Sequence, residues 1–133
     1  MKVITSGAVS FKPKKYEGAG HRYLQFWEWL EKNTHGVDYI YFEAVRRHAG
    51  TDAAHVYGGL MAFLESFCEE HNIPYAGVGV TEIKKHATGK GNASKDMIIE
   101  AMRAKGHTHL TLKDHDEADA LAIMYLKLVN APF

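Results

Sequence analysis

The chain has 133 residues, of which 46% are hydrophobic and 24% charged, and this composition excludes disordered and collagen-like chains. Its single cysteine, Cys68, excludes a disulfide framework and a multi-cysteine metal site. No apolar run approaches the roughly 18 residues of a membrane span, and residues 1–11 lack the pattern of a signal peptide. We therefore expect one cytoplasmic domain over residues 1–133 with no membrane partner.

Charge is unevenly distributed although its sum is zero. Residues 84–95 contain four lysines and no acid, whereas residues 114–119 contain four acids and no lysine or arginine. The four lysines are Lys84, Lys85, Lys90 and Lys95. Such a pair of segments suits a protein that binds phosphate in one place and a metal in another, and ordinary solvated surface charge is the alternative.

The first predicted elements are a strand, a helix and a strand. Residues 2–11 carry branched apolar side chains and predict a strand or hairpin arm. Residues 21–31 place aromatic and aliphatic side chains at helical spacing, which predicts an amphipathic helix whose aromatic stripe is core packing. Residues 37–43 are almost continuously apolar and aromatic, which predicts a strand covered on both faces.

The second half predicts three more helices, a strand and a basic loop. Residues 53–71 keep helical spacing, and residues 75–81 form a short apolar run typical of a strand. A loop over residues 81–95 then leads into a helix over residues 94–105, and a last helix begins near Asp116. Alternating strands and helices indicate an α/β fold with at least one crossover connection.

Glu43 ends an otherwise apolar strand. In open α/β sheets ligands bind at the carboxyl ends of the strands, so a carboxylate at this position is a candidate site residue. The alternative is that Glu43 marks the exit of the strand into solvent, where Arg46 and Arg47 continue as a basic loop.

Asp116 and Asp119 lie at i, i+3 spacing on one side of the last helix, ahead of an apolar face. Clustered carboxylates repel each other unless a cation neutralises them, and hard oxygen ligands favour Mg²⁺ or Mn²⁺. If Glu43 meets this pair, the three would hold one or two such ions. The alternative is that the acids only stabilise the start of a helix, and this explanation is sufficient for Asp114 and Glu117.

The basic loop contains Gly89 and Lys90, but Gly91 follows where a nucleotide-binding P-loop has Ser or Thr, so that motif is excluded. What remains is a glycine-hinged basic turn leading into a helix N-terminus. Its backbone N–H groups and lysines could approach a phosphate closely, and a merely solvated loop is the alternative.

Three motifs in this order resemble those of the RuvC-type Holliday junction resolvases, especially phage-encoded members, within the ribonuclease H-like superfamily. The motifs are Y-I-Y-F-E ending at Glu43, I-K-K-H-A-T-G-K-G-N-A-S-K over residues 83–95, and D-E-A-D-A-L-A-I over residues 116–123. The resemblance spans roughly residues 37–129.

The resemblance implies a ribonuclease H-like mixed sheet flanked by helices and a Mg²⁺-dependent endonuclease that cuts four-way DNA junctions in recombination and repair. It assigns metal binding and catalysis to Glu43, Asp116 and Asp119, and DNA contact or catalytic assistance to Lys84 and Lys95. It also implies a homodimer through the helix over residues 53–71, in a bacterial or phage-infected cell.

Two departures from the family bear on activity. No Asp precedes Asp38, so the first strand of the family, which carries a metal-binding Asp, appears absent. A truncated chain, a rearranged sheet or a strand from another copy would each account for this. The turn after Glu43 contains Arg46 and Arg47, where some resolvases have an aromatic wedge, and we expect these arginines to contact phosphate.

Because one ligand is missing, we expect weak metal binding and slow or no cleavage. The alternatives are a branched-DNA-binding domain without catalysis and a purely structural domain whose acidic pair only caps a helix.

Overall fold

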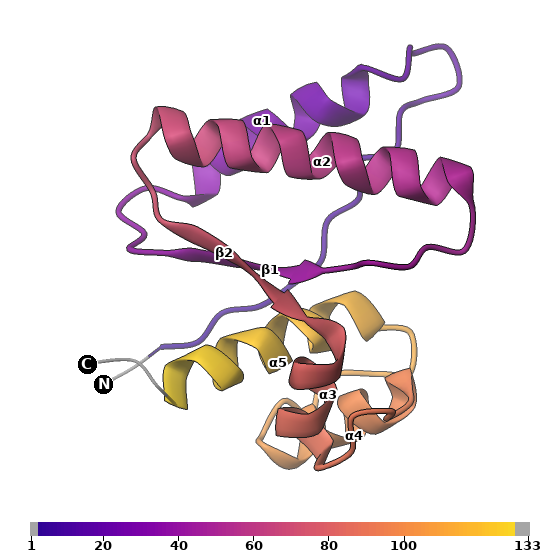
Figure 1. Cartoon of the computed structure of the whole chain (residues 1–133), viewed down its shortest axis with the longest axis vertical. Coiled ribbons are helices and arrows are strands. Elements are labelled where there is room, and N and C mark those ends of the chain that lie inside the picture. Colours follow the sequence, from indigo (N-terminus) through magenta and orange to yellow (C-terminus); the bar gives the residue numbers. More distant parts are fainter. Residues whose placement is uncertain (1–2, 130–133) are drawn as a thin grey trace. The chain divides into compact units, whose positions relative to one another are not determined.

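The computed structural model describes residues 3–129, which form five helices and two strands (Figure 1). In chain order these are α1 (His21–Asn33), β1 (Ile40–Ala44), α2 (Thr51–Glu70), β2 (Tyr75–Gly79), α3 (Val80–Thr88), α4 (Lys95–Ala104) and α5 (His115–Val129). The predicted α/β class is confirmed. Within the described range, none of the helices combines the length and apolar character needed to cross a membrane.

The predicted strand over residues 2–11 is wrong for residues 3–11, which take no regular secondary structure. Val3 is 80% exposed and Val9 52% exposed, so the alternating apolar residues have no buried face to reward strand pairing. Gly7, in the middle of the segment, further weakens a strand. The first regular element of the described chain is therefore a helix.

β1 and β2 form a two-stranded parallel sheet. β1 begins at Ile40 instead of residue 37, and all five of its residues are partly or fully exposed. The prediction of a strand covered on both faces is therefore wrong. A sheet of two strands is too narrow to bury a strand as the centre of a wide parallel sheet does.

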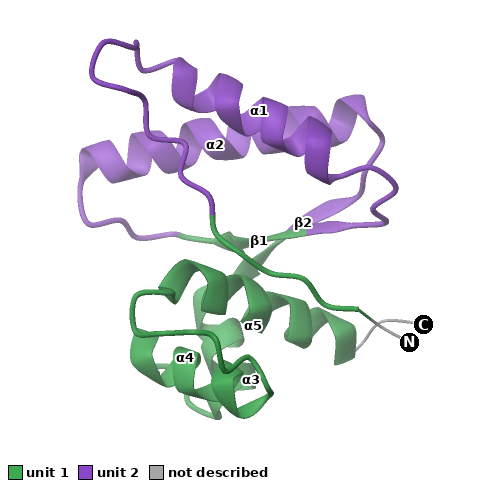
Figure 2. Ribbon diagram, turned by 180° about the vertical axis from the view of Figure 1, so that it is seen from behind, with its two compact units in different colours: residues 1–8, 41–45, 77–133 green, residues 9–40, 46–76 purple. Residues whose placement is uncertain are grey.

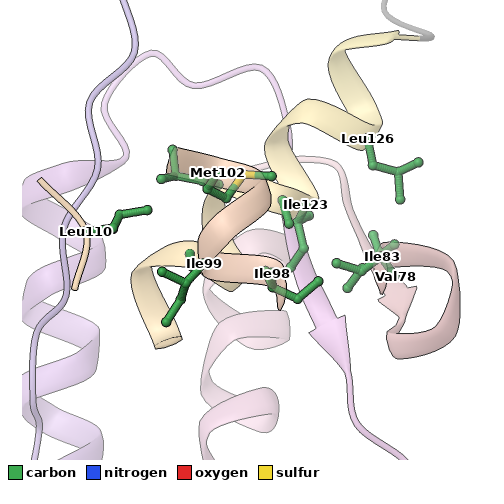
Figure 3. Packing of buried hydrophobic residues seen from close by; sticks show 11 residues of the cluster. Val78, Ile83, Ile98, Ile99, Met102, Leu110, Ile123 and Leu126 are labelled. Atoms are coloured by element: carbon green, nitrogen blue, oxygen red, sulfur yellow. The ribbon is translucent and has the colours of Figure 1, made fainter. Parts of the chain in front are cut away.

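The chain divides into two compact units, shown in Figure 2, and the first comprises residues 1–8, 41–45 and 77–133. Its core is an aliphatic cluster contributed by β2, α3, α4, the loop before α5, and α5 itself (Figure 3). The buried members are Val78, Ile83, Ile98, Ile99, Met102, Leu110, Ala118, Leu121, Ala122, Ile123 and Leu126.

The second unit comprises residues 9–40 and 46–76 and is held by aromatic packing between α1 and α2. The rings of Tyr23 and Phe63 stack at 5.2 Å, and Trp27 meets Phe67 edge-on at 5.1 Å. Tyr23 crosses α2 at Gly59, where an added Cβ would lie 2.5 Å from the ring. The aromatic stripe is thus core packing, as predicted. The assignment of residues 1–133 to one domain stays a prediction.

The loop predicted over residues 81–95 is wrong in its first half, because α3 occupies Val80–Thr88. Ile83 is buried and Ala87 packs against the same cluster, which gives this short helix an inner face. It ends at Gly89, whose φ of 86° is accessible to glycine and whose N–H donates to the Lys85 carbonyl. Lys84 and Lys85 consequently lie on a helix.

α4 matches the predicted helix to within one residue at each end. Ser94 is its N-cap, and the Ser94 hydroxyl accepts a hydrogen bond from the Met97 N–H at 3.2 Å. Lys95 is therefore held at a defined helix start.

Candidate functional site

The loop before α5 fixes where that helix begins. Arg103 of α4 donates from Nη1 to the carbonyls of Thr108 and Leu110, both at 2.6 Å. The Asp114 carboxylate accepts from the Thr111 N–H at 2.7 Å and from the Thr111 hydroxyl at 3.1 Å. These two bonds lower the pKa of Asp114. The first turn of α5, which carries Asp116, thus starts from an ordered loop.

Glu43 of β1 and the two aspartates of α5 line one cavity of about 400 Å³ within the first unit. The remaining lining residues are largely apolar: Tyr41, Phe42, Ala120, Ile123 and Met124. The structure therefore brings Glu43 together with a pair of carboxylates more than 70 residues further along the chain. Their role as metal ligands stays a prediction.

The surroundings of this cavity disfavour the ionised forms of its carboxylates. Burial, together with the charges of Glu43 and Asp116, raises the pKa of Asp119 to about 6 against the opposing effect of Lys95 and His115. Burial also raises the pKa of Glu43, against the opposing charges of Lys84 and Lys95. Repulsion of this kind is relieved by a bound cation.

The donor chemistry of the cavity suits Mg²⁺ or Mn²⁺, because all three candidate ligands are carboxylates. Yet in residues 3–129 no three or more His, Cys, Asp or Glu side chains are arranged to hold a metal ion. Asp116 is exposed, while Asp119 and Glu43 are half-buried. The residues fit the ion in kind, but they line the cavity without closing around one centre.

Two of the predicted lysines act on these carboxylates. The positive charges of Lys84 on α3 and Lys95 at the start of α4 both lower the pKa of Glu43. Lys85 and Lys90 are exposed, on α3 and just after it.

The exposed Arg46 and Arg47 belong to the second unit. Phosphate contact by these two arginines and by the four lysines stays a prediction.

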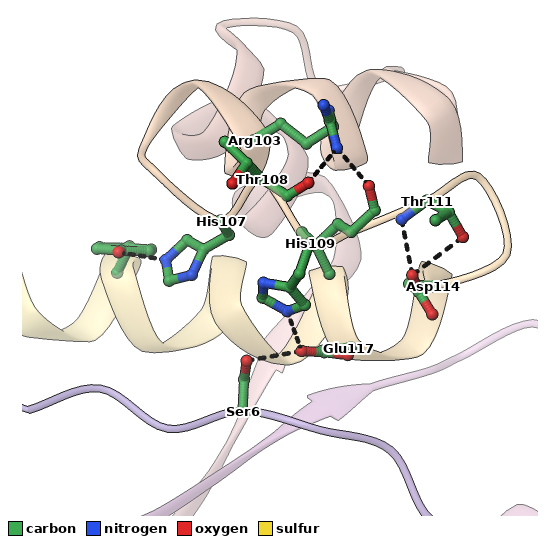
Figure 4. Close-up of polar contacts among 10 residues, drawn as sticks. Ser6, Arg103, His107, Thr108, His109, Thr111, Asp114 and Glu117 are labelled. Atoms are coloured by element: carbon green, nitrogen blue, oxygen red, sulfur yellow. Dashed lines mark hydrogen bonds and ion pairs between the residues drawn. The ribbon is translucent and has the colours of Figure 1, made fainter.

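Reasoning from the sequence missed a buried carboxylate on the other side of α5. Glu117 is 9% exposed, and its Oε2 accepts from the Ser6 hydroxyl and from His109 Nε2, each at 2.7 Å (Figure 4). These bonds lower the pKa of Glu117. Glu117 does lie in the first turn of α5, as predicted, but a helix-start role alone does not describe it, because it is also bound by Ser6 and His109. Its i, i+4 spacing to buried Leu121 was the available signal.

Comparison with known proteins identifies the fold. No protein-family model matches the sequence. A solved structure of Thermus thermophilus RuvC aligns with a TM-score of 0.67 and 22% identity over 84% of this chain and 69% of that chain. The chain has a RuvC-like fold. The T. thermophilus RuvC complex with Holliday junction substrate aligns with a TM-score of 0.57 and 18% identity, over 76% and 67% of the two chains.

The predicted resemblance to RuvC is thereby confirmed at the level of the fold, with the sheet reduced to two parallel strands. The opening segment, which would supply a further strand, instead contacts α5 through Ser6. The RuvC-like frame accounts for the meeting of a strand-borne Glu43 with acids on the last helix.

Proposed function

We propose that this chain is a divalent-metal-dependent nuclease that cleaves four-way or other branched DNA. The observation that carries the proposal is the single cavity lined by Glu43, Asp116 and Asp119 in a RuvC-like fold. One of the two RuvC structures of this fold is a complex with Holliday junction substrate, which supports branched DNA as the substrate class.

In this proposal Glu43, Asp116 and Asp119 hold Mg²⁺, with Mn²⁺ as a substitute. The ion, when bound, supplies Lewis-acid stabilisation of charge on the phosphate. Lys84 and Lys95 carry the positive charges that act on Glu43, so they would hold a phosphate beside the carboxylates and stabilise charge developing on it.

DNA binding in this proposal uses Lys84, Lys85, Lys90 and Lys95 on α3, α4 and the turn between them. These contacts are to phosphates, so affinity should fall as salt rises. Arg46 and Arg47 are proposed as further phosphate contacts, and α2 as the surface that pairs two copies into a homodimer.

The decisive experiment is Asp119→Asn, tested on a labelled four-way junction in Mg²⁺ and by electron paramagnetic resonance titration with Mn²⁺. Loss of one of three carboxylates should abolish nicking and weaken Mn²⁺ binding by at least about 100-fold, because ligand charge and number set affinity. Asp38→Asn, at an exposed position outside the helices and strands, is the matched control and should behave as the unmodified chain. Unchanged nicking by Asp119→Asn would contradict the proposal.

A branched-DNA-binding domain without catalysis is the second candidate. It is favoured by the finding that the described residues contain no complete metal cluster. Mobility shifts with a four-way junction and a linear duplex in EDTA, beside nicking assays in Mg²⁺, separate the two. Junction-selective binding without nicking would establish the second candidate. If the chain neither binds nor nicks the junction, a purely structural domain is the remaining explanation.

A further inference from the structure

Glu117 is the only charged side chain that is buried in the described part of the chain. Both of its hydrogen bonds come from outside α5, one from Ser6 in the N-terminal segment and one from His109 in the preceding loop (Figure 4). A carboxylate taken out of water without such donors is strongly disfavoured, so the two bonds define where this side chain must lie.

Because Glu117 lies on the same helical turn as the two aspartates, its hydrogen bonds also affect the direction in which they point. Successive helical residues are about 100° apart, so Glu117 points about 100° away from Asp116 and about 160° away from Asp119. A side chain held on that side fixes the rotation of the first turn about the helix axis. It thereby fixes the direction of the two aspartates.

Small rotations matter at a metal site. Side-chain atoms lie about 5–6 Å from a helix axis, so a rotation of about 20° moves them by about 2 Å. Metal–ligand distances are expected within about 0.2 Å of their ideal values. Loosening the first turn of α5 would therefore disperse the aspartates well beyond what an ion accepts.

We propose that Glu117 is a positioning residue for Asp116 and Asp119, and that Ser6 and His109 are its anchors. The N-terminal segment then controls the metal affinity of the cavity through one hydroxyl, although it takes no strand. This inference rests on the proposed function, because it concerns the affinity of the same cavity.

The test measures Mn²⁺ affinity by electron paramagnetic resonance for Ser6→Ala and His109→Ala. Each removes one anchor outside the cavity and should weaken Mn²⁺ binding by about 10-fold or more, the scale of losses when the supports of metal ligands are removed. Glu117→Gln keeps an oxygen acceptor and should bind Mn²⁺ more tightly than Glu117→Ala.

Two control variants separate positioning from general loss of stability. Ser10→Ala changes a serine of the same segment whose hydroxyl accepts from the Lys12 N–H. Tyr125→Phe removes a 2.6 Å bond between α5 and His107 of the same loop, about two turns beyond Glu117. Both should keep Mn²⁺ affinity within about twofold, since neither bond anchors the turn that carries the aspartates.

A second readout uses the metal-free protein. Hydrogen exchange of the amides of residues 115–119 should be faster in Ser6→Ala and His109→Ala than in Tyr125→Phe. Equal Mn²⁺ affinity in the anchor variants and Tyr125→Phe would overturn the positioning role and leave the proposed function standing. Absence of Mn²⁺ binding by the unmodified chain would overturn the proposed function, and this inference with it.

Discussion

The pKa values of the carboxylates on the two sides of the start of α5 are shifted in opposite directions. On the anchored side, hydrogen bonds from Ser6 and His109 lower the pKa of Glu117. On the cavity side, burial and the charges of Glu43 and Asp116 raise the pKa of Asp119 to about 6. Glu117 receives its hydrogen bonds from within the chain, whereas the cavity carboxylates repel each other, and a bound cation or a proton would relieve that repulsion. The difference supports the proposal that the cavity side, and not the Glu117 side, binds a cation.

Removing the apolar support that both sides share should have the largest effect. Leu121 is 2% exposed and belongs to the core cluster of the first unit. Leu121→Ala should lower the free energy of unfolding by about 2–5 kcal/mol, measured by urea denaturation, because it leaves a cavity behind the turn. Val129→Ala, at a 68% exposed position of the same helix, should change it by less than about 0.5 kcal/mol. Equal effects of the two substitutions would show that Leu121 does not support this turn.

The comparison also predicts how stability depends on pH without metal. The folded pKa of Asp119 lies above its usual value of 3.8, so folding favours the protonated form, and stability is lost as pH rises from about 4 through 6. In EDTA at pH 8, Asp119→Asn should stabilise the protein by about 1–2 kcal/mol after allowance for solvent screening. The gain should vanish below pH 4.

Asp114→Asn is the control of opposite sign. The pKa of Asp114 is lowered by its bonds to Thr111, so its charge stabilises the fold at neutral pH and this stabilisation is lost as pH falls through its pKa. Asp114→Asn should therefore destabilise the protein at pH 8. A gain of stability in both variants would contradict the distinction between hydrogen-bonded carboxylates and those of the cavity.

The features that were predicted correctly are those that depend on short stretches of sequence. The stripe of Tyr23, Trp27 and Leu30 located α1, because this signal lies inside the element itself. The motifs around Glu43 and Asp116 predicted the RuvC-like fold because they keep the family's order and spacing.

The predictions that failed concern features that depend on residues distant in sequence. The alternation of apolar residues in residues 3–11 does not reveal whether the rest of the protein offers a surface that would bury them. In the structure this segment does not form a strand. α3 has a single buried residue, Ile83, which is too weak a periodic signal against two neighbouring glycines. Glu117 was missed because its donors are Ser6 and His109, one of them more than 100 residues away. The single domain, the homodimer and the arginine contacts stay predictions.

A smaller effect is expected at the start of α4, which contacts the first turn of α5 through Asp96 and His115. Asp96 accepts from His115 Nε2 at 3.2 Å, one residue beyond Lys95. Ser94→Ala removes the N-cap bond to the Met97 N–H and should cost about 1 kcal/mol of unfolding free energy. Ser94→Asp keeps an acceptor and should restore the loss. If alanine and aspartate variants unfold alike, the cap contributes nothing measurable.

The smallest expected effect tests whether Lys95 belongs to the cavity. Its charge opposes the rise in the pKa of both Asp119 and Glu43. Lys95→Ala should therefore raise the pKa of Asp119 further, observable by carbon-13 NMR titration of the side-chain carboxylate in metal-free protein. Lys85→Ala, an exposed lysine of α3, is the matched control for removing one positive charge. At high salt a surface effect would disappear, whereas the Lys95 effect should persist in part because Asp119 is half-buried. Equal shifts in the two variants would assign the effect to net charge and remove Lys95 from the site.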